Sequence, residues 1–177
     1  MANPLDPVME WYRIALDGLR VAQRAIYLQA PGVIQDKHLF HQLDPQAAIN
    51  RLEAAKSDLA RLTVLDLAAV FERVLRQFIL GEVNRGYPAP GLLHDAIRGE
   101  FEYDIRFWGF AERLIGVFPG VDPQLRGDVK KVIRYRDWVA HAGRLNPMPS
   151  EKQPDNVVPE VAEQRLTEFL KAVGIVA

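Results

Sequence analysis

The sequence predicts an all-α protein, an up-and-down bundle of about five helices. Apolar residues recur at helical spacing through most of the chain, and no run of β-branched residues alternates with polar ones as a strand requires. The dipeptide Asp-Pro, a cap followed by a residue suited to a first helical turn, occurs at three expected helix starts. With 177 residues, of which 49% are hydrophobic, the chain has the size and composition of a single domain.

The first helix is expected over residues 7–29, with Asp6 as the N-cap and Pro7 in the first position. Its apolar stripe indicates the buried face: Val8, Trp11, Tyr12, Ala15, Leu19, Ala22 and Ile26. A loop follows, opened by Pro31-Gly32 and carrying His38 and His41, which we interpret as surface residues.

The second helical segment is expected to begin after the cap Asp44 and to end at Arg85-Gly86. Thr63 and Asp66 have the spacing of a capping box, so the segment is either one long helix or two abutting helices.

The second half of the chain is divided by proline-rich breaks. A helix is expected over 92–118, with a candidate interruption near Gly99, and its buried residues should be Phe101, Ile105, Trp108, Ala111, Leu114 and Ile115. Another helix follows over 123–145, capped by Asp122. Residues 1–146 would then form the bundle core, followed by a proline-rich connector over 147–158 and a C-terminal helix within 159–177.

Composition excludes several classes of function. The chain has no cysteine, which removes disulfides and thiol chemistry, and its histidines lack metal-ligand spacing, so we predict no metal and no cofactor. The net charge of −1 argues against a protein that coats duplex phosphates. Without a basic leader or an apolar stretch of membrane-spanning length, the sequence predicts a cytoplasmic protein with no membrane association.

The segment Arg136-Asp137-Trp138-Val139-Ala140-His141 carries the candidate site. Arg136 projects from the middle of an apolar helix face, where a guanidinium must be paired with a carboxylate or line a cleft that receives an anion. His141 adds a group that titrates near neutral pH. The surrounding helix is basic, which suits contact with a few phosphates or, alternatively, a solvated face: Arg126, Lys130, Lys131, Arg134, Arg136 and Arg144 outnumber Asp128 and Asp137.

Helical geometry separates Arg136 from His141. Five residues correspond to about 140° of rotation, so the two side chains do not share a face. Asp137 lies four residues before His141 and could orient its imidazole. Glu72, on an earlier helix, is the natural partner for Arg136. The alternative interpretation is that Arg136 is structural and that Asp137 and His141 are solvated neighbours.

The Arg136–His141 segment resembles the R-x(4–6)-H motif of the HEPN superfamily (higher eukaryotes and prokaryotes nucleotide-binding), in which a polar residue such as Asp137 commonly follows the Arg. Residues 65–73, which contain Glu72, resemble the family's earlier core helix with its acidic residue. The resemblance covers a small fraction of the chain. It implies a HEPN-like bundle and a metal-independent endoribonuclease, often a toxin or defence effector with a cognate antitoxin.

The resemblance further implies a homodimer whose two Arg/His pairs build one composite cleft for single-stranded RNA. His141 would transfer protons, Arg136 would stabilise the phosphorane, and Glu72, Arg134 and Arg144 would support them. Gly143 departs from relatives that carry a nucleotide-accepting Tyr two residues after the His. Because other members of the superfamily are non-catalytic, a dimerisation, nucleotide-binding or regulatory interaction module remains the second hypothesis.

The later helices are rich in aromatic residues, which either supply a dimer surface or fill the core: Phe101, Phe107, Trp108, Phe110 and Trp138.

Overall fold

The computed structural model describes residues 2–28, 40, 43–86, 92–141 and 157–177. These residues form five α-helices and one π-helical turn: α1 (Asp6–Tyr27), α2 (Pro45–Gly86), α3 (Leu92–Phe107), η1 (Phe110–Leu114), α4 (Pro123–His141) and α5 (Pro159–Ala172). The described residues contain no β-strand, which confirms the all-α class. None of the helices in these ranges has the length and apolar content needed to cross a membrane.

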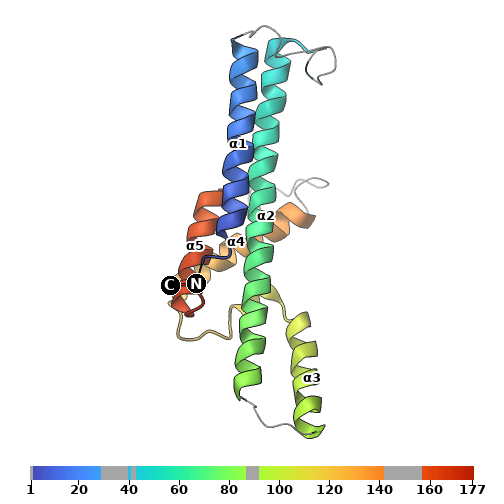
Figure 1. The fold of residues 1–177 in the computed structure, drawn as a ribbon, viewed down its shortest axis with the longest axis vertical. Helices are drawn as coiled ribbons and strands as arrows, with labels where there is room; N and C mark the ends of the chain where they lie inside the picture. Colours follow the sequence, from blue (N-terminus) through green and yellow to red (C-terminus); the bar gives the residue numbers. More distant parts are fainter. Residues whose placement is uncertain (1, 29–39, 41–42, 87–91, 142–156) are drawn as a thin grey trace.

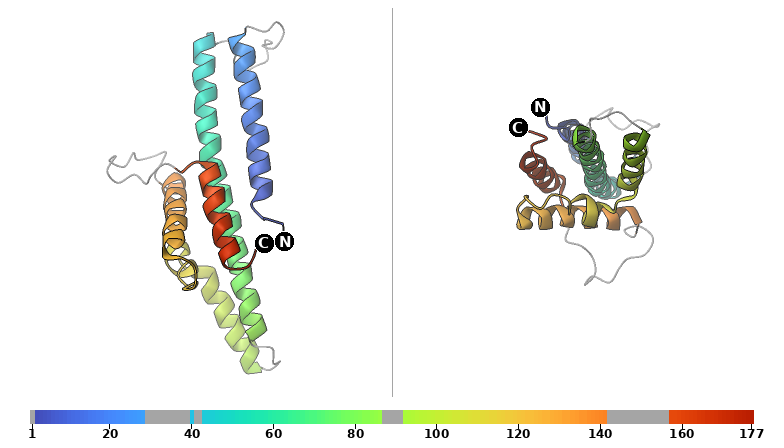
Figure 2. Two further views of the ribbon diagram at one scale, coloured as in Figure 1. Left: turned by 90° about the vertical axis from the view of Figure 1, so that its left-hand side faces the viewer. Right: turned by 90° about the horizontal axis from the view of Figure 1, so that it is seen from below.

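Helix α2 is the axis of the molecule (Figure 1). α1 packs antiparallel along one half of it, and α3 returns along the other half. α4 crosses α2 obliquely, and α5 packs against both α2 and α4 (Figures 1 and 2). The helix direction therefore alternates from α1 to α3, as in an up-and-down bundle, whereas α4 crosses α2.

α2 is one continuous helix of 42 residues, so the single long helix is the correct alternative. Thr63 lies inside it and is fully buried, and its hydroxyl donates to the carbonyl of Leu59 at 2.8 Å. The predicted capping box at Thr63 is wrong, because a hydroxyl inside a helix can bond the preceding turn instead of starting a new one.

Two of the three predicted caps are confirmed. The Asp44 carboxylate accepts from the backbone N–H of Ala47 at 2.9 Å, and the Asp122 carboxylate accepts from that of Leu125 at 3.0 Å. Each bond satisfies a backbone donor that the first helical turn leaves without a partner.

The start of α1 differs from the prediction. Asp6 is the first residue of the helix, and the capping position belongs to Leu5, which makes no side-chain cap bond. The Asn3 carboxamide instead accepts from the backbone N–H of Leu5 at 3.2 Å. Trp11, expected to be buried, is 51% exposed, because α1 is apolar on two sides and only one of them faces α2.

The helix predicted over 92–118 is divided after Phe107. Gly99 lies within α3, and the interruption falls at Gly109, whose backbone is extended (φ −59°, ψ 128°) before η1 begins. Gly116 closes this turn: a Cβ there would lie 2.3 Å from the Glu112 carbonyl oxygen, so only glycine fits. Phe101, expected to be buried, is exposed on α3.

The main core surrounds the middle of α2. Phe71 packs edge-on against Phe169 of α5 at 5.6 Å between ring centroids, and it contacts Phe110 at 6.0 Å. A second, small apolar cluster lies where α1 ends and α2 begins, and comprises Ile26, Ala48 and Leu52. The core thus fixes α4 and α5 on the central part of α2.

The C-terminal helix lies within the predicted range 159–177. α5 ends at Ala172, and Gly174 then reverses the backbone with a φ of +78°, a conformation that favours glycine. The end of the predicted motif helix and most of the proline-rich connector, residues 142–156, lie outside the described residues.

Candidate functional site

Arg136 of α4 is fixed on three sides. Its Nη2 donates to Glu72 Oε2 of α2 at 2.7 Å, and its Nη1 donates to Asp137 Oδ1 at 2.9 Å. The guanidinium carbon lies 5.2 Å from the centroid of the Phe110 ring, within cation–π range. The side chain is 22% exposed. Arg136 therefore has the carboxylate partner considered from the sequence, and its side chain remains partly exposed to solvent.

Glu72 joins Arg136 to a second arginine. Its Oε1 accepts from Arg76 Nη2 at 2.6 Å and from Arg76 Nε at 3.1 Å. Arg76 also donates to the backbone carbonyls of Ile105 and Trp108, the latter at 3.0 Å. We call Arg76, Glu72, Arg136 and Asp137 the ion network; its two positive and two negative groups balance.

The ion network connects three parts of the fold. Glu72 and Arg76 come from α2, Arg136 and Asp137 come from α4, and the two accepting carbonyls lie at the end of α3 and just beyond it. Charges that lose contact with water need partners of opposite sign, so this network stabilises the packing of α4 on α2. The same contacts hold the Arg136 guanidinium in one orientation.

His141 lies at the exposed C-terminal end of α4. None of the other described residues forms a hydrogen bond with its imidazole, and the Asp137 carboxylate, expected to orient it, bonds Arg136 instead. With respect to the described residues, the His141 side chain is therefore exposed.

Most of the basic charge on α4 is matched locally. Lys130 pairs with Glu112 at 3.0 Å, and Lys131 pairs with Asp128 at 2.8 Å. Arg134 is exposed and has no ion pair within the described ranges. Arg144, the other basic residue predicted to support the site, lies outside the described residues. Among the described residues, the accessible cationic groups near the end of α4 are therefore few, which suits a local anion contact more than an extended basic surface.

Arg76 and Phe110 contact the site residues but lie outside the sequence motif that predicted the site. The four-residue spacing of Glu72 and Arg76 was visible and is typical of an ion pair on one helix face. The Phe110 contact with Arg136 was not predictable, because it depends on how η1 folds against α4.

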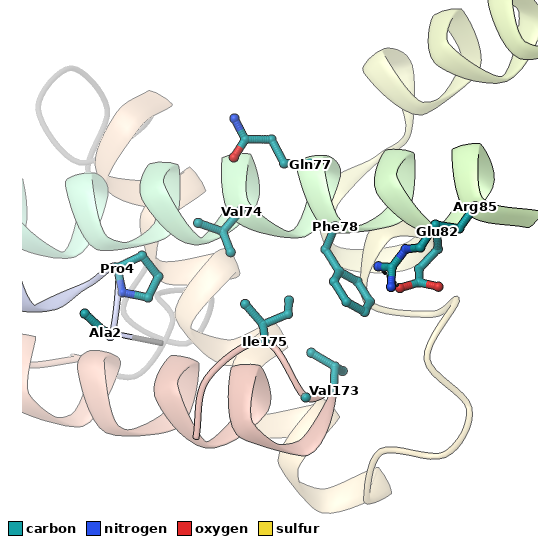
Figure 3. Close-up of a pocket in the computed structure, with 10 residues that line it drawn as sticks. Ala2, Pro4, Val74, Gln77, Phe78, Glu82, Arg85, Val173 and Ile175 are labelled. Atoms are coloured by element: carbon teal, nitrogen blue, oxygen red, sulfur yellow. Dashed lines mark hydrogen bonds and ion pairs between the residues drawn. The ribbon is translucent and has the colours of Figure 1, made fainter.

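A pocket of about 660 Å³ is lined by no residue of α4 (Figure 3). Figure 3 shows it between α2, the N-terminal segment and the turn after α5, with Val74, Phe78 and Ile175 on its apolar wall. Its charged residues, Glu82 and Arg85, pair with each other. The pocket includes neither Arg136 nor His141. Within the described parts of the chain, no group of three acidic, histidine or cysteine side chains is placed to hold a metal ion.

Comparisons of the chain with protein-family models, with curated proteins and with solved structures gave no match.

Proposed function

We propose that this chain is a HEPN-type endoribonuclease that cleaves single-stranded RNA without a metal ion. The proposal rests on the arrangement of α4, where an oriented and partly exposed guanidinium, Arg136, precedes an exposed imidazole, His141, on the same helix. A fixed cation and a group that transfers protons near neutral pH are the two functions that metal-free phosphodiester cleavage requires. The resemblance of this segment to the HEPN motif adds the reaction class.

The proposed site is shared by two copies of the chain. Along one α4, Arg136 and His141 differ by about 140° in direction and about 7.5 Å in height. Two α4 helices that face each other across a two-fold axis bring Arg136 of one copy toward His141 of the other. A closed dimer of this kind has two equivalent Arg/His combinations beside one cleft.

The reaction proceeds within the RNA strand. The ribose 2′-hydroxyl loses its proton and its oxygen bonds to phosphorus, while the bond from phosphorus to the 5′-oxygen breaks and that oxygen gains a proton. The products are a 2′,3′-cyclic phosphate and a 5′-hydroxyl. His141 takes or gives one of these protons, and Arg136 stabilises the negative charge that develops on the phosphorane.

Arg136 retains hydrogen-bonding capacity for this role. A guanidinium has five N–H donors, and the contacts with Glu72 and Asp137 use two of them. The remaining donors can contact phosphate oxygens while the carboxylates hold the plane of the group. Arg134, exposed on the same helix, can support the strand outside the reacting phosphate, and the basic Arg144 can serve similarly.

The ion network also favours a second candidate, a non-catalytic HEPN-like module for dimerisation, nucleotide binding or regulation. In such a module the pairing of Arg136 with Glu72 serves stability alone. The module predicts no RNA cleavage, and a nucleotide-binding form of it predicts thermal stabilisation by a nucleotide. A role as a toxin or defence effector, with a cognate antitoxin as partner, is expected only if the chain is the endoribonuclease.

The experiment compares cleavage of an unstructured, end-labelled RNA by the purified wild type and by variants in excess chelator. His141→Ala should lower the rate by about a hundredfold or more, the usual contribution of an acid–base group. Lys131→Ala, an exposed basic residue on the same helix, is the matched control and should retain the rate. Equal cleavage by all proteins, or none by the wild type, contradicts the proposal.

A mixing experiment tests the shared site. Arg136→Lys and His141→Ala should each be inactive alone, because each lacks one of the two functions. Mixed and allowed to exchange subunits, they form heterodimers in which one combination has both Arg136 and His141 intact. Recovery of cleavage in the mixture supports the composite cleft, and a mixture as inactive as its components contradicts it.

A further inference from the structure

Helix α1 carries an apolar stripe that faces away from the rest of the chain. Its members are spaced by three, four, three, four and three residues, and we call them the α1 seam: Trp11, Ile14, Gly18, Val21, Ala25 and Leu28. The four large members are 51%, 67%, 70% and 62% exposed, in chain order. Alternate spacing of three and four is the pattern of a coiled-coil contact line.

The α1 seam is distinct from the face that packs on α2. That face contains Val8, Tyr12 and Ile26, all buried. With about 100° per residue, the centre of the seam lies roughly 130° around the helix from it. A Cβ built on Gly18 would meet nothing within 4 Å, so the seam is open at its middle. An exposed apolar line of this length indicates a contact with another molecule.

We propose that the α1 seam binds the α1 seam of a second copy of this chain in antiparallel orientation. Side-chain size selects the orientation. In the antiparallel register in which Gly18 of one copy lies opposite Val21 of the other, Ala25 lies opposite Ile14. Each small residue then packs against a large one. A parallel pair would instead place Gly18 on Gly18 and Trp11 on Trp11, leaving a gap beside a crowded layer.

Charge along the edge of the seam supports the same orientation. Asp17 and Arg24 lie on one flank of the seam, one helical repeat of seven residues apart. Residues on this flank face each other across an antiparallel pair. Asp17 of each copy therefore meets Arg24 of the other, and two-fold symmetry forms this pair twice. In the single chain Asp17 contacts only the exposed Arg20, at 3.2 Å, among the ion pairs of the described residues.

This interface lies apart from the proposed cleavage site. α1 and α4 pack on different sides of α2 (Figure 2), so a contact through the α1 seam leaves His141 uncovered. The inference goes beyond the proposed function and does not depend on it. If both contacts form, two different two-fold interfaces join the chains into a tetramer or a longer assembly.

The first test measures mass in solution by light scattering and native mass spectrometry over a concentration series. Val21→Glu places two like charges at the centre of the seam and should reduce the mass of the assembly, by half where the wild type is a dimer or a tetramer. Val117→Glu, a matched change at an exposed valine outside α1, should leave it unchanged. A wild type that is monomeric at every concentration, or an assembly that Val21→Glu does not reduce, overturns the proposal.

The second test determines orientation with introduced cysteines, which is possible because the chain has no cysteine of its own. Ile14→Cys and Ala25→Cys are made as separate single variants. In the antiparallel pair, the thiol introduced by Ile14→Cys in one copy faces the thiol introduced by Ala25→Cys in the other, whereas like thiols are about 16 Å apart along the helix axis. Mild oxidation should therefore link the mixed variants and neither variant alone. Links within each variant alone overturn the antiparallel arrangement.

The third test exchanges the flanking charges. Asp17→Arg should raise the dissociation constant by between about twofold and thirtyfold, the range for two exposed ion pairs. Adding Arg24→Asp to it restores opposite charges across the interface and should recover most of the affinity. If the double variant is as weak as the single variant, Asp17 and Arg24 do not face each other. RNA cleavage, measured in parallel, reports separately on the site at α4.

Discussion

Glu72→Gln tests whether the ion network stabilises the packing of α4 on α2. The amide keeps the shape of the side chain and removes the negative charge that Arg76 and Arg136 share. These two guanidinium side chains are 19% and 22% exposed, so water replaces the lost carboxylate only in part. Arg136 retains Asp137, and Arg76 retains two backbone carbonyls.

The expected loss follows from this geometry. A hydrogen bond to a charged group contributes about 1.5–3 kcal/mol, and Glu72 accepts such bonds from two arginines. Because both partners keep other contacts, we expect a loss of about 3 kcal/mol in the free energy of unfolding, between the values for exposed and buried pairs. For a domain of this size that corresponds to a fall in melting temperature of roughly 6–12 °C.

Urea unfolding and calorimetry provide the measurement, with Glu82→Gln as the matched control. Glu82 lies on the same helix and pairs with Arg85, but both side chains are about half or more exposed, at 48% and 70%. That pair should contribute less than about 0.5 kcal/mol. If Glu72→Gln and Glu82→Gln lose equal stability with unchanged urea dependence, the ion network has no special role and the structural account of Arg136 is refuted.

Three further predictions concern the fold. Asp122→Ala removes the carboxylate that accepts from Leu125 N–H and should lower the free energy of unfolding by about 1 kcal/mol, measured by urea unfolding. Gly81→Ala adds a methyl group that meets no other atom at a position within α2, and it should raise the free energy of unfolding by up to about 1 kcal/mol. This gain should be visible as a higher melting temperature, and a decrease would contradict the assigned helix. Burial and the Glu160 carboxylate raise the pKa of Tyr12, so its folded-state pKa exceeds the ordinary value of about 10. The protonated Tyr12 hydroxyl contributes its full stabilisation below about pH 10, and this contribution is lost as pH rises through the folded-state pKa. Above about pH 10, the free energy of unfolding measured in urea should therefore fall less for Tyr12→Phe than for the wild type.

Helix starts could be predicted from the sequence where a capping residue lies next to the first helical turn. The caps Asp44 and Asp122 bond their own first turns, so each helix start depends on a few adjacent residues. Thr63 shows where this fails: its spacing from Asp66 is that of a capping box, but its hydroxyl bonds the Leu59 carbonyl inside a continuous helix. The predicted burial of Trp11 is wrong for another reason. Helical periodicity does not determine which of two apolar faces of α1 packs against α2.

The candidate site was predictable in composition more than in geometry. The sequence offered Glu72 as the carboxylate partner of Arg136, since a guanidinium on an apolar face needs either such a partner or a cleft that receives an anion. It did not show that Asp137 bonds the neighbouring Arg136, because that choice depends on side-chain rotamers at the α2–α4 contact. The division of the chain near Gly109, which brings Phe110 under Arg136, depends on tertiary packing and had no strong local signal.

The length of α2 means that one helix passes through regions of different local stability. Its central residues, including Leu67 and Phe71, are fully buried in the main core, whereas its first turns rest on the small cluster of Ile26, Ala48 and Leu52. Amide hydrogen exchange should therefore be slowest around Phe71 and faster near Ala48, where the tip of the α1–α2 hairpin can open while the centre stays folded. Protection along α2 should follow the neighbours of each turn, although every turn belongs to the same helix.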